Sequence, residues 1–100
     1  MILYNITVIV EDSILADWMS WITPNFISPI EQSGMLSGNK MYKVLGSPNE
    51  GVTICIQFQA GSMESFQQFK QQIEPALMAS HGERFQSKAL AFTSLMEQIN

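Results

Sequence analysis

An α+β fold is the class that this sequence predicts, and three observations lead to it. Residues 52–60 alternate strictly, and residues 2–10 alternate between a fully apolar side and a mixed side, as the two faces of a strand do. A segment with apolar residues at helical spacing follows each of these strands. Turn-forming residues at 46–51 lie between two strand patterns at hairpin distance. The predicted order is therefore strand-helix-strand twice, or βαββαβ, which is the ferredoxin-like plan with two helices on one face of a four-stranded antiparallel sheet.

The first half of the chain is predicted to hold a strand and an interrupted helix. The first strand has one fully apolar face, made of Tyr4, Ile6, Val8 and Val10. The helix follows a cap at Asp12 or Ser13, whose side-chain oxygen can accept a hydrogen bond from a free backbone N–H. Its apolar stripe reaches about Ile22, and Pro24 should kink or restart it because proline lacks the backbone donor. Gly34 is the expected end of the continuation.

The second half begins with a hairpin and continues with another helix. The pattern at 41–45 predicts a strand that pairs antiparallel with the one after it, and a start as early as Met35 stays open. Ser62 is the expected cap of the second helix. The apolar face of this helix consists of Phe66, Phe69, Ile73 and Leu77. We expect Pro75 to kink the helix and the helical pattern to fade near His81.

The last strand runs from Lys88 to about Gln98, and its larger apolar side is expected to hold Leu90, Phe92 and Met96. Right-handed crossovers place the first and third strands at the centre of the sheet, with both helices on one face. The other face is then half polar, and its expected members are Leu3, Asn5, Thr7, Ile9, Thr53, Cys55, Gln57, Gln59, Ala91 and Thr93. Water can cover such a face. Its apolar members favour a second copy of the chain instead, which makes a closed homodimeric α/β barrel.

Composition limits the classes of function. The chain has 100 residues, enough for one domain over 1–100, and only 14% of them are charged. Five scattered basic residues against nine acidic ones argue against a nucleic-acid partner. The single cysteine excludes a disulfide scaffold and a multi-cysteine metal site, and we expect no metal and no cofactor. The start lacks the basic region of a signal peptide and the length of a membrane span, so we predict a cytoplasmic protein without membrane contact.

The chain also resembles a small family of uncharacterised bacterial proteins over essentially its whole length. The resemblance lies in the opening Met1–Val8, the pair Trp18 and Trp21, and the stretches Gly51–Ile54, Glu74–Leu77, His81–Phe85 and Lys88–Thr93. It implies the dimeric ferredoxin-like α/β-barrel architecture and no reaction, because the family is classed as a domain of unknown function. One departure is visible: members often carry a His-Ile-Pro step where this chain has Phe26-Ile27-Ser28.

Two groups of residues are candidates for ligand binding. Polar residues on the central strands would need partners inside a barrel, which a ligand or ordered water could supply, and these are Asn5, Thr7, Gln57 and Gln59. A hydrated dimer interior is the alternative for this group. His81, the only histidine, precedes Arg84 and Lys88, and together they could hold a small anion. The alternative is a histidine that caps the last helical carbonyls, with Arg84 on the surface.

Three functions stay open, and the sequence predicts no catalytic residue for any of them. The leading hypothesis is a homodimeric α/β barrel that is non-catalytic or binds a small molecule. The second is a cofactor-independent monooxygenase or isomerase acting on a small hydrophobic molecule, which rests on analogy with the fold alone. The third is a protein-interaction module that docks through its glutamine-rich second helix. Cys55 lies between two isoleucines, so we interpret it as a small buried side chain and not as a nucleophile.

Overall fold

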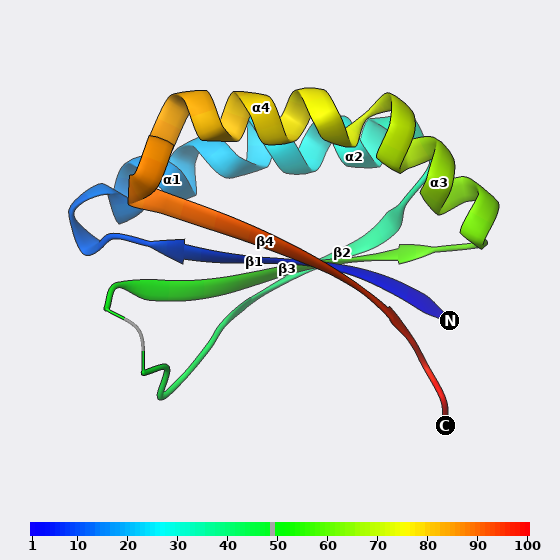
Figure 1. The fold of residues 1–100 in the computed structure, drawn as a ribbon, viewed down its shortest axis with the longest axis horizontal. Coiled ribbons are helices and arrows are strands. Elements are labelled where there is room, and N and C mark those ends of the chain that lie inside the picture. The colour runs from blue at the N-terminus through cyan, green and yellow to red at the C-terminus, as the bar shows by residue number, and fades with distance from the viewer. Residues whose placement is uncertain (49) are drawn as a thin grey trace.

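The computed structural model describes residues 1–48 and 50–100. Its main elements, in chain order, are β1 (Ile2–Val10), α1 (Leu15–Ile22), α2 (Ser28–Ser33), β2 (Ser37–Lys43), β3 (Val52–Ala60), α3 (Met63–Gln72), α4 (Glu74–Phe85) and β4 (Ala89–Glu97). The strands pair antiparallel in the order β2-β3-β1-β4, and the helices all cover one face of the sheet (Figure 1). This confirms the predicted α+β fold. Asn49, inside the predicted turn at 46–51, lies outside the described residues.

The core lies between the two central strands and the helices. β1 and β3 pair along their whole length, from Ile2 opposite Ala60 to Val10 opposite Val52. The side chains that these strands turn toward the helices are buried, among them Tyr4, Ile6, Val8, Val10, Ile54, Ile56 and Phe58. They pack against buried residues that include Trp18, Ile22, Ile30, Phe66, Phe69 and Phe85. The alternation of side-chain direction along both strands therefore places one fully apolar face against the helices, as predicted.

The first helical segment is interrupted where the proline was expected to interrupt it. α1 ends at Ile22, a π-helical turn spans Thr23–Ile27 with Pro24 in its first turn, and α2 follows. Gly34 ends α2 in the left-handed conformation, with φ of 73°. The predicted cap was wrong, because residues 12 and 13 lie in a 3₁₀ turn, Asp12–Ile14, and no side chain caps this turn or α1. The 3₁₀ turn leads directly into α1 and takes the place of a side-chain cap.

The second helical segment also breaks at its proline. The Ser62 hydroxyl caps α3 by accepting a hydrogen bond of 3.1 Å from the Ser65 N–H. The helix is broken at Ile73, and Pro75 lies in the first turn of α4, where its missing donor is tolerated. The segment does not fade near His81 but continues to Phe85. His81 and Phe85 are four residues apart and both buried, so packing of this helix face maintains the helix through an exposed glycine.

Two residues of β4 lie on the face of the sheet opposite to the one predicted for them. Its register places Thr93 opposite Ile6, on the helix side, and Phe92 opposite Thr7, on the other side. Ala91 and Thr93 therefore do not belong to the face away from the helices; the residues of β4 on that face are Leu90, Phe92, Ser94 and Met96. Both sides of this strand carry apolar residues, so alternation alone does not determine its orientation. The small Ala89 and Ala91 pack on the core, and the larger side chains are left outside.

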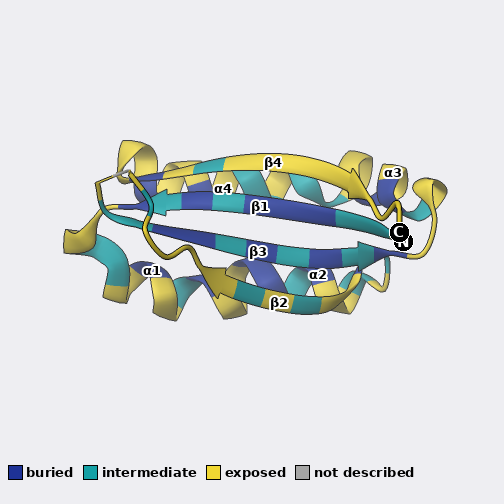
Figure 2. Ribbon diagram, turned by 90° about the horizontal axis from the view of Figure 1, so that it is seen from below, coloured by how far each residue is buried: buried dark blue, intermediate teal, exposed yellow. Residues whose placement is uncertain are grey.

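Figure 2 shows the sheet from its uncovered side, with β4 and β2 largely exposed at the two edges and β1 and β3 more buried between them. Within the described residues, no helix is both long enough and apolar enough to cross a membrane.

Candidate functional site

The sheet face away from the helices carries four of the six residues predicted to bind a ligand. We call it the open face, and it comprises Leu3, Asn5, Thr7, Ile9, Lys40, Tyr42, Thr53, Cys55, Gln57, Gln59, Leu90, Phe92, Ser94 and Met96. Asn5 lies directly opposite Gln57, and Gln59 lies opposite Leu3. The pairing of β1 with β3 thus brings the predicted polar residues of the two strands together at the centre of the sheet.

Asn5 is the most enclosed of these polar residues. It is only 7% exposed, although it belongs to the open face. Its Nδ2 donates a hydrogen bond of 2.9 Å to Thr7 Oγ1, and Thr7 Oγ1 lies 3.6 Å from Cys55 Sγ. Among the buried side-chain nitrogen and oxygen atoms of residues 1–48 and 50–100, Asn5 Oδ1 alone has no hydrogen-bond partner. A buried carbonyl oxygen without a donor is costly, so this atom favours a donor from outside the single chain.

The edges of the open face are apolar. On β4, Leu90, Phe92 and Met96 are 46%, 55% and 41% exposed. On β2, Tyr42 is half exposed and lies opposite Cys55. The open face therefore has a polar centre flanked by large exposed apolar side chains, and it is more apolar than the sequence predicted because β4 presents its larger residues here. Large apolar side chains are therefore exposed at both edges of the open face.

His81 lies across the sheet from this face and is a core residue. It is 3% exposed, and its Nε2 accepts a hydrogen bond of 3.0 Å from Trp18 Nε1. The rings of Trp21, Phe26 and Phe85 surround it, with centroids at 6.0, 6.1 and 5.3 Å. This burial lowers the pKa of the imidazole below its ordinary value, because desolvation disfavours the charged form. His81 neither caps a helix end nor reaches the open face.

Arg84 is also engaged within the chain. Its guanidinium donates two hydrogen bonds to the Asp17 carboxylate, at 2.8 and 2.6 Å, and lies 5.0 Å from the centre of the Phe85 ring. Both charged groups are exposed, so the pair links α4 to α1 at modest gain in stability. Neither His81 nor Arg84 lies near Asn5, so the six predicted ligand-binding residues do not form one site.

Cys55 and His81 lie on opposite faces of the sheet, so they are not a nucleophile and its base. Cys55 belongs to the open face and is half-buried beside Thr7. In the part of the chain that the structure describes, no group of three or more His, Cys, Asp or Glu side chains is arranged to hold a metal ion.

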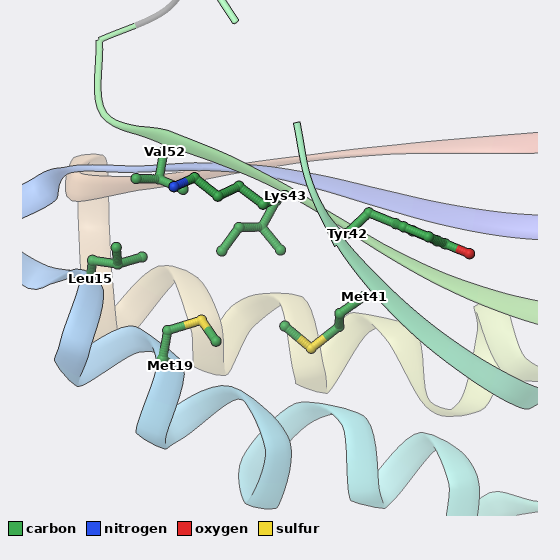
Figure 3. A pocket seen from close by; sticks show the side chains of 7 residues that line it. Leu15, Met19, Met41, Tyr42, Lys43 and Val52 are labelled. Atoms are coloured by element: carbon green, nitrogen blue, oxygen red, sulfur yellow. The ribbon is translucent and has the colours of Figure 1, made fainter. Parts of the chain in front are cut away.

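Two cavities on the helix side were not predicted from the sequence. The first, called here the edge pocket, has a volume of about 290 Å³ and is lined by Leu15, Met19, Met41, Tyr42, Lys43, Val52 and Ile54. Figure 3 shows Leu15, Met19 and Met41 directed into the space between α1 and β2, while Tyr42 points away from it. The sequence contains no local signal for this pocket, because its walls come from three elements that only the fold brings together.

The second cavity, of about 300 Å³, lies at the opposite edge of the sheet and is lined by Tyr4, Phe66, Lys70, Thr93, Ser94 and Leu95. The Tyr4 hydroxyl donates a hydrogen bond to the Glu74 carboxylate, whose other oxygen lies 3.4 Å from Lys70 Nζ. Burial, and then the hydrogen bond to Glu74 and its charge, raise the pKa of Tyr4 far above its ordinary value. The phenol is therefore protonated at any physiological pH.

The fold and the two-sided sheet define the class of protein: a ferredoxin-like α+β domain with helices on one face and a largely uncovered second face. The chain belongs to the family described as a domain of unknown function (DUF4286), whose profile matches residues 1–99. A search of the curated proteins finds no match to the sequence.

Solved structures share the fold at low sequence identity. A dimeric ferredoxin-like protein from an uncultured marine organism has a TM-score of 0.72 at 14% identity, covering 100% of this chain and 96% of the other. A variant of MhuD with two manganese protoporphyrin IX molecules per active site has a TM-score of 0.65 at 17% identity, covering 100% and 96%. Hydroxynitrile lyase from Passiflora edulis has a TM-score of 0.63 at 16% identity, covering 99% and 96%. At these identities the likeness shows the fold.

Proposed function

We propose that this protein works as a homodimer that binds a small molecule, with the open faces of two copies packed against each other to close an α/β barrel. The observation that carries the proposal is the composition of the open face, in which Leu90, Phe92 and Met96 are exposed and Asn5 Oδ1 has no hydrogen-bond partner among residues 1–48 and 50–100. Apolar side chains at this exposure gain free energy when a second sheet covers them.

The size of the open face fits a stable dimer. β1, β3 and β4 each have nine residues, and four strands lie side by side. At ordinary strand geometry they extend about 30 Å by about 19 Å, or roughly 600 Å² in projection. A specific interface buries about 800 Å² on each partner, so one sheet face is of the right order. The dimeric neighbour from the marine organism supports this arrangement of the fold.

The ligand is the second part of the proposal. In a closed barrel, Asn5, Thr7, Gln57 and Gln59 line the interior, and Asn5 Oδ1 would accept a hydrogen bond from a ligand, from ordered water or from the partner. The chain also contains an apolar cavity on the helix side, at the lower end of the volumes of small-molecule sites. His81 and Arg84 are outside this proposal, because both are occupied within the chain. A bacterial, cytoplasmic setting stays a prediction.

Native mass spectrometry of freshly purified protein tests both parts. We expect a dimer with the additional mass of a bound molecule. Denaturation should release this molecule, and its mass then identifies it. A dimer without additional mass would contradict the proposal that the protein binds a small molecule. A monomer would contradict the proposal that two chains form a barrel.

A charge placed on the open face tests the interface directly. We expect Phe92→Glu to give a folded monomer, because each dimer would otherwise bury two carboxylates in an apolar contact. Phe92 is 55% exposed, so the substitution leaves the single-chain core intact. The matched control is Met63→Glu, at a 45% exposed residue on α3, which should stay dimeric by light scattering after size-exclusion chromatography. Dimeric Phe92→Glu would show that the open face is not the interface.

An enzymatic role is the second candidate and has a narrower basis. Two of the structural neighbours are, by their descriptions, a lyase and a protein with an active site, and both share only the fold with this chain. A cofactor-independent monooxygenase or isomerase therefore remains an alternative, as does a protein-interaction module.

A further inference from the structure

One wall of the edge pocket is a side of α1 that lies at the margin of the core. Trp18 and Ile22, four residues apart, are buried against the core. Leu15 and Met19 form the neighbouring line of residues, also four apart, and they face β2. One helix thus fills the core with one line of side chains and forms a wall of the pocket with the next.

Apart from Tyr42, whose side chain points away from the cavity, the lining of the edge pocket is apolar with one exception. Leucine, methionine, valine and isoleucine side chains make up its walls, and two flexible methionines face each other across it (Figure 3). Such thioether side chains adapt to ligands of different shapes. The volume of about 290 Å³ is roughly twice the 150 Å³ that suffices to hold benzene in an apolar protein cavity. A hydrocarbon chain of about eight carbons fits within this space.

The exception is Lys43 on β2, an exposed residue whose side chain lines the pocket (Figure 3). Lys43 forms no ion pair with any residue of 1–48 or 50–100, and no acidic side chain lines the pocket. An unpaired cation at the mouth of an apolar cavity is complementary to a molecule with a hydrocarbon body and a single negative charge at one end.

We propose that the edge pocket binds a small apolar carboxylic acid, with its hydrocarbon part between Met19 and Met41 and its carboxylate on Lys43 Nζ. This rests on the proposed function, because it names the class of ligand that the small-molecule-binding dimer takes. Of the open-face residues only Tyr42 lines the pocket, and its side chain points away from the cavity (Figure 3), so the site is available on each chain of the dimer.

Isothermal titration calorimetry of the purified full chain with sodium octanoate and with 1-octanol tests the proposal. Octanoate should bind, and hexanoate should bind about fifteenfold more weakly, since each buried CH₂ is worth about fourfold in affinity. Lys43→Met should lower the affinity for octanoate about tenfold and change the affinity for octanol by less than about twofold. Lys88→Met removes an equivalent charge outside the pocket and should change neither affinity.

A steric variant tests the location of the site. Met19→Trp fills the mouth of the edge pocket and should lower the affinity for both octanoate and octanol at least about tenfold. Met63→Trp is the matched control, because Met63 and Met19 are both 45% exposed and lie on different helices. Should Met19→Trp fail to fold, the difference between acid and alcohol in Lys43→Met still decides the question.

Three results overturn the proposal: octanoate affinity unchanged in folded Met19→Trp, an equal loss of octanoate and octanol in Lys43→Met, or no measurable binding of either probe. If native mass spectrometry nevertheless finds a dimer with a bound molecule of other chemistry, the proposed function stands and only this assignment of the pocket fails.

Discussion

The buried histidine makes the stability of this fold depend on pH in a way that can be measured. His81 is the only histidine, is 3% exposed, and accepts a hydrogen bond from Trp18 on the nitrogen that a proton would occupy. The pKa of His81 in the folded chain lies below the ordinary value of 6.5. At a pH between the pKa of the folded chain and that of the unfolded chain, only the unfolded chain binds a proton at this residue. Stability is therefore highest above pH 6.5 and falls as the pH is lowered.

The magnitude follows from proton linkage. Uptake of one proton by the unfolded chain alone sets the upper limit: the free energy of unfolding should fall by at most about 1 kcal/mol from pH 6.5 to 5.5 and by at most about 2 kcal/mol from pH 7.5 to 5. His81 is the only histidine, and histidine is the side chain whose ordinary pKa lies in this range. Urea unfolding followed by tryptophan fluorescence at a fixed protein concentration measures the effect.

The control is His81→Gln, whose side-chain oxygen can still accept the hydrogen bond from Trp18 but cannot be protonated. Its stability should be nearly constant over the same range of pH, even if it is lower overall. An equal pH dependence in His81→Gln and in the natural chain would refute the reasoning, since another group would then be responsible.

Three further substitutions test a close backbone approach at Gly51 and the hydrogen bond between Tyr4 and Glu74. Gly51→Ala should cost more than about 2 kcal/mol, because φ is 83° and the added Cβ would lie 2.4 Å from the Val10 carbonyl oxygen. Gly46→Ala, with φ of 71° and open space around it, should cost only about 1 kcal/mol, and equal costs would exclude the clash as the cause. Tyr4→Phe should cost about 1–2 kcal/mol in urea unfolding, because Glu74 loses a donor while the ring packing remains; no loss would show that this hydrogen bond is not stabilising.

The breaks and ends of the helices were predictable because each depends on a few neighbouring residues. Pro24 and Pro75 remove a backbone donor wherever they stand, and each coincides with an interruption. Gly34 takes a conformation that other residues avoid, and Ser62 places its hydroxyl on the N–H three residues later. The cap expected at residues 12 and 13 failed because a 3₁₀ turn precedes α1.

The candidate site was only partly predictable. Strand alternation placed Asn5, Thr7, Gln57 and Gln59 on one face, and the register confirms that they lie together. The prediction that His81 joins Arg84 and Lys88 in holding an anion rested on their closeness in the sequence. In the fold, His81 instead contacts Trp18 and other aromatic side chains. Trp18 and His81, which share the hydrogen bond, are 63 residues apart in the sequence. Local sequence spacing cannot predict a contact between residues that far apart.

The sequence by itself determined the α+β class, the order of the elements and the faces of the two central strands. These follow from backbone periodicity and from residues that permit or prevent local hydrogen bonds. Tertiary structure alone decided the orientation of β4, the continuation of α4 to Phe85, the Tyr4–Glu74 contact and the edge pocket. Each of these depends on how side chains of distant segments fill one shared volume, and that competition is resolved only when the whole chain packs.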